Sequence, residues 1–311
     1  MNLLPCESAL ELFCGIGGWA AAVGQLGSPA ASVVAVDIDR TALAVHQQNF
    51  PQHRRIVAEL ASFDARRISA DFWWLSPPCL PFTRKGPQRD LSDRRTQSLV
   101  HLIGQLGPDS AGPSALAIEN VPPFADSQTA AWINEHLQRA GYETAWEIRC
   151  PSELGWPMRR RRAYLVASRL GLRGLARPQI QRRSLADLLD RPAAMEVYPA
   201  QQLSVPSDWL AKYAAAIDII DPRQADCQAA CFTSSYGRSP VRSGSYLRCQ
   251  SSAVRFFTPE EILRMLGFPE TFSWPATIEL RRRWELAGNS ISLPVVQWVL
   301  SRIGFVAATD I

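Results

Sequence analysis

The sequence predicts an α/β fold, a doubly wound parallel sheet with helices on both faces. Three features of the first half of the chain lead to this expectation. Short apolar runs alternate with helical patterns, a glycine-rich turn follows the first run, and polar residues stand directly after several later runs. The chain has 311 residues, of which 47% are apolar, enough for one large domain or two with a substantial core.

Composition favours a reduced intracellular enzyme. Charged residues make up 20% of the chain, too few for a disordered protein. The seven cysteines form no short-spaced framework, no charged-then-apolar leader opens the chain, and no apolar stretch is long enough for a membrane span. We therefore expect a cytoplasmic protein without a disulfide scaffold. The net charge of +4 is small, but arginines cluster at residues 94–95, 159–162, 182–183 and 281–283, which is compatible with a polyanionic partner.

The first apolar run and the turn after it predict a ligand loop. Residues 8–13 are a strand candidate that leads into a turn with Gly15, Gly17 and Gly18, and residues 19–26 are predicted to form a helix. Glycines permit a tight turn and a close approach of the backbone to a ligand. The spacing is not the full dinucleotide motif, so an ordinary strand-to-helix turn is the alternative.

The second strand candidate, residues 32–36, strengthens this interpretation. It ends at Asp37, about 20 residues beyond the glycines, where doubly wound folds place an acid that accepts hydrogen bonds from a ribose. Alternatively, Asp37 caps the following helix, and Asp39 suits either role. The turn and the acid together predict a nucleoside-bearing cofactor.

The run at residues 72–75 leads into a proline-rich loop around Cys79. Pro77, Pro78 and Pro81 fix their own φ and restrict the residues before them, so the loop holds the thiol in one orientation. A nucleophile at the carboxyl end of a strand needs such an arrangement. A buried structural cysteine is the alternative, since free cysteine is among the most buried residue types.

Two further groups are predicted to lie at the same edge of the sheet. Glu119 follows the run at residues 116–118, and a carboxylate there is costly to bury unless it meets a partner. Residues 163–167 are another strand candidate, directly after the basic run 159–162. Because side chains alternate along an extended chain, Arg160 and Arg162 share one face and can point into a site. A solvated basic run is the alternative.

Residues 168–254 lose the alternating pattern, gain prolines, and are expected to form a small second domain, inserted into a catalytic domain of residues 1–167 and 255–311. The end of this segment is rich in arginine, serine, glycine and tyrosine, which suits phosphate contacts and base stacking, although a surface linker is equally compatible with it. Cys227, Cys231 and Cys249 lack a fourth ligand, so we expect no metal site. After the insert, Thr258 and Glu261 predict a capping box before a helix at 262–266, and a last helix is predicted at 294–303.

Several motifs, in their order along the chain, resemble those of the cytosine-5 methyltransferases. They are Phe13-Cys14-Gly15-Ile16-Gly17-Gly18, Pro77-Pro78-Cys79, Glu119-Asn120-Val121, Arg160-Arg161-Arg162 and Gly288-Asn289-Ser290. More narrowly, the loop through Thr83 and Arg84, the segment Asp93-Arg94-Arg95-Thr96 and the segment Cys231-Phe232-Thr233 before Tyr236 resemble the branch that methylates a cytosine in the anticodon loop of tRNA. Leu80, where the family usually has glutamine, and Met158, in place of a polar residue, depart from the pattern.

The resemblance implies a Rossmann-like, S-adenosylmethionine-dependent methyltransferase domain with a small target-recognition domain. The Cys79 thiolate adds to carbon 6 of cytosine, carbon 5 takes the methyl group, and S-adenosylhomocysteine is the product. Glu119 binds N3 and the exocyclic amine, while Arg160 and Arg162 hold O2 and favour the thiolate. By resemblance, the cofactor contacts Phe13, Gly15, Gly17, Gly18, Asp37, Ile38, Glu59, Pro77 and Asn289, and the RNA contacts Pro78, Thr83, Arg84, Arg95, Cys231, Phe232, Thr233, Tyr236, Arg238 and Arg242.

Two other functions remain open on the sequence. A DNA cytosine-5 methyltransferase of a restriction system would share every catalytic residue, and a nucleic-acid-binding protein that has lost catalysis would share the fold. The short variable region and the Cys-Phe-Thr segment argue against the first, and the intact catalytic set argues against the second. We expect a monomer that binds tRNA and at most weakly DNA. No sequence feature identifies the base that removes the carbon-5 proton.

Overall fold

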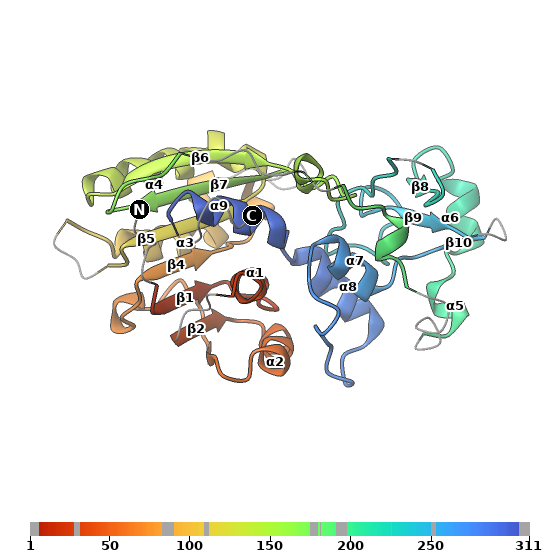
Figure 1. Cartoon of the computed structure of the whole chain (residues 1–311), viewed down its shortest axis with the longest axis horizontal. Helices are drawn as coiled ribbons and strands as arrows, with labels where there is room; N and C mark the ends of the chain where they lie inside the picture. Colours follow the sequence, from red (N-terminus) through yellow and green to blue (C-terminus); the bar gives the residue numbers. More distant parts are fainter. Residues whose placement is uncertain are drawn as a thin grey trace. The chain divides into compact units, whose positions relative to one another are not determined.

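A computed structural model describes residues 6–27, 32–82, 90–108, 112–174, 180, 182–190, 198–224, 226–249 and 253–304. The predicted site residues Thr83 and Arg84 lie outside these ranges. The chain divides into two compact units, which Figure 1 traces by colour along the sequence. The first unit takes residues 1–149, 161–178 and 295–311, and the second takes residues 150–160 and 179–294.

The first unit is built around one sheet. Within the described ranges it has seven strands in the order β3-β2-β1-β4-β5-β7-β6. The strands from β3 to β5 pair in parallel, whereas β7 pairs antiparallel with both β5 and β6. The bounds are β1 (Ser8–Leu12), β2 (Ser32–Asp37), β3 (Arg54–Val57), β4 (Phe72–Leu75), β5 (Ala115–Asn120), β6 (Glu143–Arg149) and β7 (Arg162–Ser168).

The predicted α/β fold is confirmed, with two differences. One end of the sheet is antiparallel rather than parallel, because β7 runs against β5. The second difference is that the sheet contains β3 and β6, two strands that were not predicted from the sequence. Both are edge strands with charged, partly exposed residues, so they lack the apolar run by which the central strands are identified.

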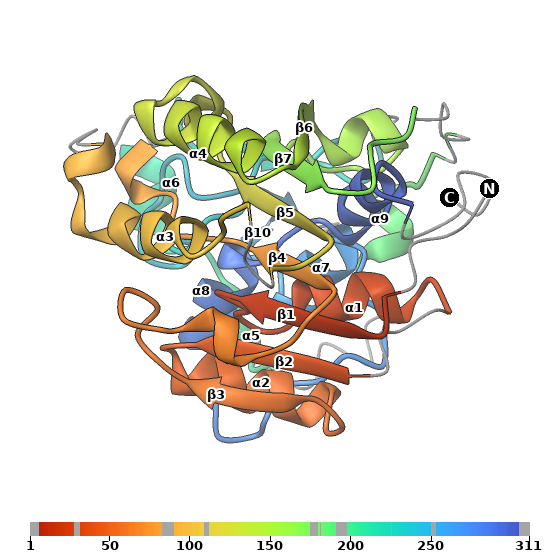
Figure 2. The ribbon, with the colours of Figure 1, turned by 90° about the vertical axis from the view of Figure 1, so that its left-hand side faces the viewer.

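Helices cover both faces of this sheet (Figure 2). On one face, α3 (Arg94–Gly104) and α4 (Gln128–Arg139) bury Leu99 and Ile133 in one cluster with Leu10 of β1. On the other face lie α1 (Gly18–Gly24), α2 (Arg40–Asn49) and α9 (Leu293–Ser301). There Trp19 stacks on Phe72 with 5.7 Å between ring centroids. The alternation of side chains along each buried strand thus supplies an apolar layer to both faces, as a doubly wound fold requires.

The second unit contains a small sheet and short helices. Its strands β8 (Ile219–Ile220), β9 (Tyr246–Arg248) and β10 (Val254–Arg255) pair in the order β10-β9-β8. Aromatic rings fill its core, with Tyr236 edge-on to Phe256 and Trp284 at centroid distances of 5.5 and 5.7 Å. The remaining elements are η5 (Pro151–Leu154), η6 (Ala186–Leu188), α5 (Ala200–Leu203), α6 (Ser207–Lys212), α7 (Pro259–Met265) and α8 (Leu280–Asn289).

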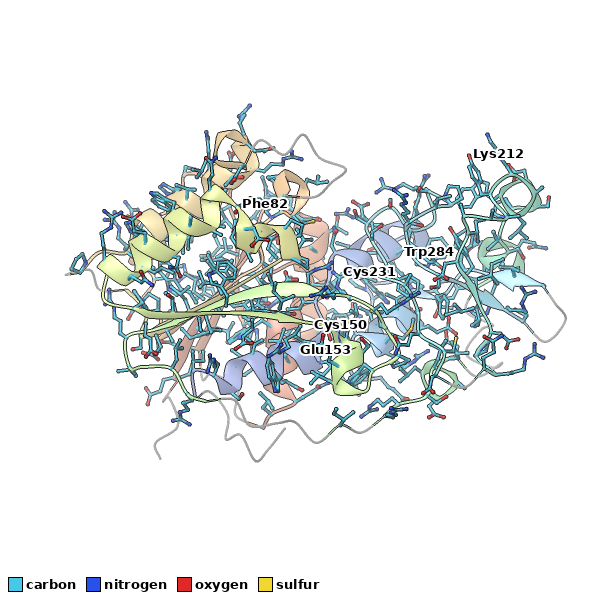
Figure 3. All side chains as sticks on the ribbon, turned by 90° about the horizontal axis from the view of Figure 1, so that it is seen from above. Phe82, Cys150, Glu153, Lys212, Cys231 and Trp284 are labelled. Carbon is cyan, nitrogen blue, oxygen red and sulfur yellow. The ribbon has the colours of Figure 1, made fainter. Side chains whose placement is uncertain are left out.

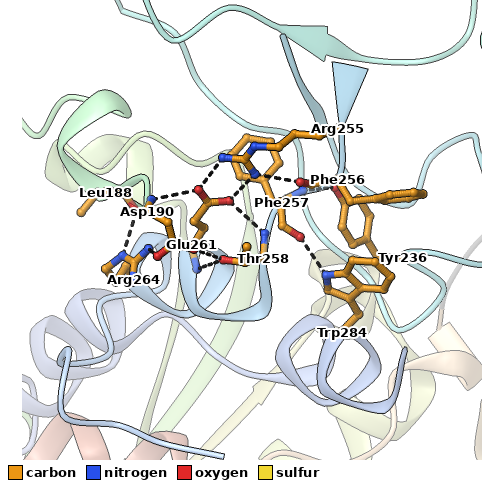
Figure 4. Close-up of polar contacts among 10 residues, drawn as sticks. All are labelled: Leu188, Asp190, Tyr236, Arg255, Phe256, Phe257, Thr258, Glu261, Arg264 and Trp284. Carbon is orange, nitrogen blue, oxygen red and sulfur yellow. Dashed lines mark hydrogen bonds and ion pairs between the residues drawn. The ribbon is translucent and has the colours of Figure 1, made fainter. Parts of the chain in front are cut away.

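A buried polar network starts α7 and confirms the predicted capping box (Figure 4). The Thr258 hydroxyl accepts from the Glu261 N–H at 3.1 Å, and the Glu261 carboxylate accepts from the Thr258 N–H at 2.9 Å. The same carboxylate forms a two-bond ion pair with Arg255, at 2.7 and 2.8 Å. Glu261 is fully buried, so these bonds replace the water that its charge loses.

The unit boundaries differ from the predicted domain boundaries. The second unit includes most of the predicted insert, residues 168–254, but it also takes residues 150–160 and continues through α7 and α8 to residue 294. The sequence instead predicts that the segment after residue 254 belongs to the catalytic domain. The division of roles between the two units stays a prediction. No helix among the described residues is long and apolar enough to cross a membrane.

Candidate active site

The loop that carries Cys79 follows β4 and is anchored at both ends. Before it, the Ser76 hydroxyl accepts a hydrogen bond from Trp74 Nε1 at 2.8 Å. After it, Phe82 is buried and packs edge-on against Phe124, with 4.8 Å between centroids. The Phe82 N–H donates to the Cys79 carbonyl at 3.0 Å and closes a turn. Cys79 itself is partly exposed, which argues against the alternative of a buried structural cysteine.

The loop after β5 holds the Cys79 loop directly. Strands β4 and β5 pair in parallel with Leu75 opposite Ile118, so their carboxyl ends are neighbours. Asn120 Nδ2 donates to the Pro77 carbonyl at 3.2 Å, and Asn120 Oδ1 accepts from the Val121 N–H at 2.8 Å. No structural or catalytic role was predicted for Asn120 from the sequence. Its position directly after Glu119 was the only signal.

Glu119 meets the partner that its burial requires. The residue is 6% exposed, and Oε1 lies 3.2 Å from Nε of Arg162. In the register of β5 and β7, Glu119 stands opposite Tyr164, so Arg162 is its diagonal neighbour on the same face. Arg162 thus places a positive charge next to the buried carboxyl group at the end of β5. The predicted Glu119 and Arg162 are therefore brought together.

Arg95 belongs to the same region of the first unit. Asp93 caps α3 and binds the Arg95 guanidinium through two bonds, at 2.9 and 2.6 Å. The hydrogen bonds that Arg95 donates to Asp93 raise the pKa of Arg95, and a negative charge on Cys79 would add to this rise. Arg95 was predicted as an RNA contact; the structure adds this electrostatic link to Cys79.

The glycine turn after β1 is fastened by Asp37. Its Oδ2 accepts from the Gly15 N–H at 2.8 Å, and its Oδ1 accepts from the Asp39 N–H at 2.9 Å. Burial raises the pKa of Asp37. Asp39, not Asp37, caps α2, by accepting from the Thr41 N–H at 2.9 Å. Since a carboxylate offers about four acceptor positions, Asp37 retains capacity for ribose hydroxyls.

Three further predicted cofactor contacts, Phe13, Ile38 and Glu59, follow the strands β1, β2 and β3. Ile38 is 66% exposed, an unusual state for a large apolar side chain next to a polar loop. Glu59 is exposed and follows β3, whose next residue, Ala58, donates its N–H to the Asp37 carbonyl at 3.1 Å. Phe13 adopts a left-handed φ of 54° at the start of the turn. An exposed apolar side chain, an acid and a glycine turn fit a nucleoside-bearing cofactor such as S-adenosylmethionine.

Gly17 has a second reason to be glycine. It takes φ 91° as the N-cap of α1, and a Cβ there would lie 2.6 Å from the Phe50 ring and 2.8 Å from the His46 ring. Beneath the turn, His46 Nε2 lies 3.5 Å from a carboxylate oxygen of Glu11, and both side chains are buried. The turn therefore rests on a packed aromatic and polar layer. Gly17 is required by this packing as well as by any ligand.

Arg160 does not have the arrangement that we expected of a residue holding the base. It is 4% exposed, and its guanidinium donates to the carbonyls of Phe232 at 2.9 Å and Gly288 at 3.3 Å. It also donates to the Ser290 carbonyl and lies 3.2 Å from the Cys231 sulfur. These bonds go to protein groups, so the observed role of Arg160 is to join two segments of the second unit.

The two segments that Arg160 joins are in direct backbone contact. A Cβ on Gly288 would lie 2.3 Å from the carbonyl of Thr233, which no side chain could tolerate. Only a glycine lets α8 approach the Cys-Phe-Thr segment so closely. Two separate motifs of the sequence are thereby explained by one contact.

Two predicted RNA contacts of the second unit are buried. Phe232 and Tyr236 are each 1% exposed. The Tyr236 hydroxyl donates to the Ser245 carbonyl at 2.8 Å and accepts from the Phe257 N–H at 2.9 Å. Figure 4 shows Tyr236 beside Phe257 and Trp284. Their burial supports a packing role rather than contact with a substrate. The other predicted RNA contacts are at least partly accessible: Pro78, Arg238 and Arg242 are exposed, and Cys231 and Thr233 are half-buried. Asn289, which was predicted as a cofactor contact, is exposed.

Comparisons with known proteins agree with this arrangement. The chain is 28% identical to the human tRNA (cytosine(38)-C(5))-methyltransferase, over 92% of this chain and 96% of that protein. It is 28% identical to the enzyme of the same name from Schizosaccharomyces pombe, over 94% and 95% of the two chains. The fold matches the Entamoeba histolytica methyltransferase EhMeth with a TM-score of 0.86 and 24% identity, over 97% and 98% of the two chains. A family model described as C-5 cytosine-specific DNA methylase matches residues 8–304. With the motifs in order and the sheet that carries them, the chain belongs to the C-5 cytosine-specific DNA methylase family.

Proposed function

We propose that this protein methylates carbon 5 of a cytosine in the anticodon loop of a tRNA, with S-adenosylmethionine as the methyl donor. The observation that carries the proposal is the hydrogen bond from Asn120 to the Pro77 carbonyl. It ties the loop of a partly exposed Cys79 to the strand that presents the Glu119–Arg162 pair. A nucleophile and an anchored carboxylate at one edge of a sheet are what addition to a cytosine ring requires.

The side chains divide the chemistry as follows. The Cys79 thiolate forms a bond to carbon 6, and the electrons of the carbon 5–carbon 6 double bond become available for a bond from carbon 5 to the methyl group. Glu119 stabilises the ring by a hydrogen bond at N3, and Arg162 holds Glu119 in place. Loss of the carbon-5 proton then restores the double bond and expels Cys79.

The cofactor supplies the electrophilic methyl group when bound. The turn at Gly15, together with Asp37, Ile38 and Glu59, would hold it, because these residues line the carboxyl edge of β1 to β3, where open α/β sheets bind nucleosides. Asp37 keeps the turn closed through the Gly15 N–H at 2.8 Å. The chain's own contribution at this end is therefore binding and orientation.

The choice of tRNA rests on the relatives and on the cost of exposing the base. Both curated relatives named above are tRNA methyltransferases that act on a cytosine numbered 38 in their names. A cytosine must leave its stack before Cys79 can reach carbon 6, and this costs least in an RNA loop. The family model is named for DNA, so duplex DNA is the alternative substrate.

Methyl transfer from labelled S-adenosylmethionine tests the proposal. The purified protein is given bulk tRNA, the same tRNA annealed to a complement that covers the anticodon loop, and duplex DNA; bisulfite sequencing then locates the methylated cytosine. We expect transfer to unpaired tRNA and little to the other two. Cys79→Ala should abolish transfer while cofactor affinity stays near the wild-type value. Faster methylation of a defined duplex DNA sequence than of any tRNA would overturn the tRNA assignment.

A further inference from the structure

The second unit contains a pocket that the proposed chemistry does not use. Its volume is about 430 Å³, within the range of sites that bind small organic groups. It is lined by η5 and the residues after it, by Arg182 and Arg183, and by the segment 226–228. Figure 3 labels Glu153, which stands on η5 at the pocket.

A flat cation forms one wall of this pocket. The Arg183 guanidinium lies over the Trp156 indole, with 4.5 Å from its central carbon to the ring centroid. The Arg183 N–H donates to the Gly155 carbonyl at 2.9 Å, which fixes the backbone on which this arginine stands. Arg183 is exposed and Trp156 is half-buried, so the guanidinium presents its outer face. Guanidinium planes and indole rings are the surfaces on which unstacked nucleobases are held.

Polar groups surround the platform. Glu153 and Asp226 supply exposed carboxylates, and Gln228 supplies an amide. Arg182 Nη1 lies 3.2 Å from Asp226, but their side chains are 81% and 77% exposed, so this pair is weak and a ligand could replace it. Carboxylates at the edge of a stacking platform accept hydrogen bonds from exocyclic amines of bases. The pocket therefore combines a stacking surface with edge recognition.

The pocket is connected to the Arg160 cluster through paired backbone. The Ala229 N–H donates to the Pro157 carbonyl at 2.9 Å, and the Arg159 N–H donates to the Ala229 carbonyl at 2.8 Å. Trp156 lies at one end of this pairing and Arg160 at the other.

We propose that this pocket binds a second unpaired nucleobase of the RNA, distinct from the cytosine that is methylated. The base would stack on the guanidinium of Arg183, and its exocyclic amine would donate to Glu153 or Asp226. This inference rests on the proposed function, since it assumes a single-stranded RNA substrate.

An abasic scan tests the inference. Anticodon stem-loops that each lack one loop base are titrated against the wild type, Trp156→Ala and Arg183→Ala, and binding is measured by fluorescence anisotropy. Since stacking of one base contributes about 1–3 kcal/mol, loss of the bound base should weaken wild-type binding roughly 5- to 150-fold at one position other than the target cytosine. Both variants should bind the intact RNA as weakly as the wild type binds that abasic RNA, and they should be insensitive to the same abasic position.

Lys212→Ala is the matched control, because Lys212 also lies over an aromatic ring, Tyr213, at 5.4 Å. Lys212 stands well away from Glu153 in the second unit (Figure 3). The Lys212→Ala substitution should therefore leave the pattern of the scan unchanged. Thermal unfolding and cofactor titration show whether the variants are folded. A flat scan at every non-target position, or equal weakening of all RNAs by the two variants, overturns the pocket. Absence of tRNA methylation by the wild type would instead overturn the proposed function, since binding is measured independently of turnover.

Discussion

Arg162 and Arg160 stand two residues apart in one basic run, yet their guanidinium groups bind different kinds of partner. Arg162 begins β7 in the first unit and forms a 3.2 Å ion pair with Glu119 at the edge of the sheet. Arg160 lies in the second unit, where its guanidinium binds backbone carbonyls of the segments around Phe232 and Gly288. At the sheet edge the motif residues keep groups that a substrate can use. In the second unit the motif side chains are buried and bind other groups of the protein.

The difference shows that a motif can be fixed by packing as firmly as by chemistry. Arg160, Phe232 and Tyr236 were predicted as site residues from their motifs, and all three are buried. Cys79 and Arg95 come from motifs of the same kind and are partly exposed. Substitutions can separate the two cases, because a chemical role affects rate and a packing role affects stability.

The largest contrast is expected between Arg162→Lys and Arg160→Lys. Lysine cannot reproduce a guanidinium that holds Glu119, so Arg162→Lys should lower the methylation rate by about 100-fold or more while the unfolding free energy changes little. Arg160→Lys leaves buried carbonyls without donors and should lower the unfolding free energy by about 2–4 kcal/mol. Single-turnover rates and urea unfolding on both variants measure this. The comparison fails if Arg160→Lys is as stable as the wild type.

The glycine turn offers a contrast within the first unit. Gly17→Ala should cost about 3 kcal/mol or more, since its Cβ meets the Phe50 ring at 2.6 Å in addition to the strain of a φ of 91°. Gly15→Ala has a φ of 53° but no atom within 4 Å of its Cβ, so we expect a cost of about 1–2 kcal/mol. The main effect of Gly15→Ala should be weaker binding of S-adenosylmethionine, which calorimetry measures. Equal losses of stability would show that the layer under Gly17 yields easily.

A third contrast lies within the second unit. Tyr236→Phe removes the hydroxyl that bonds Ser245 and Phe257, and should cost about 1–3 kcal/mol of unfolding free energy while RNA affinity in the folded protein is unchanged. Arg238→Ala removes an exposed side chain and should leave stability within about 0.5 kcal/mol. If Arg238 contacts a phosphate, RNA binding weakens and its salt dependence falls by about one unit of slope. An unchanged salt dependence would remove Arg238 from the interface.

A pH dependence of stability is expected beneath the glycine turn. Burial, with further contributions from His46 and Arg55, lowers the pKa of His53 to about 4. The folded state then binds fewer protons than the unfolded state, whose histidine has its usual pKa near 6.5. Stability should therefore fall as the pH decreases from about 6.5 to about 4. His53→Phe keeps the stacking on Phe50 and should flatten this part of the profile; urea unfolding at several pH values measures the difference.

Much of the first unit follows from the sequence. The buried strands β1, β2, β4 and β5 carry largely apolar runs, and because these strands are parallel, their carboxyl ends lie at a common edge. That rule is sufficient to predict from the sequence that Asp37, Cys79 and Glu119 lie at one edge. The capping box at Thr258 was equally accessible, because its bonds lie within four residues.

Only the tertiary structure decided the remaining roles. Local spacing indicated that Arg160 and Arg162 share a face. It did not indicate that Arg162 would meet a carboxylate and that Arg160 would meet backbone carbonyls 72 to 130 residues away along the chain. Likewise, the need for glycine at Gly288 comes from the Thr233 backbone that packs against it. The sequence determined which groups are available and at which edge the strands end. Which of these groups stay accessible to a substrate depends on long-range packing, and no local pattern records it.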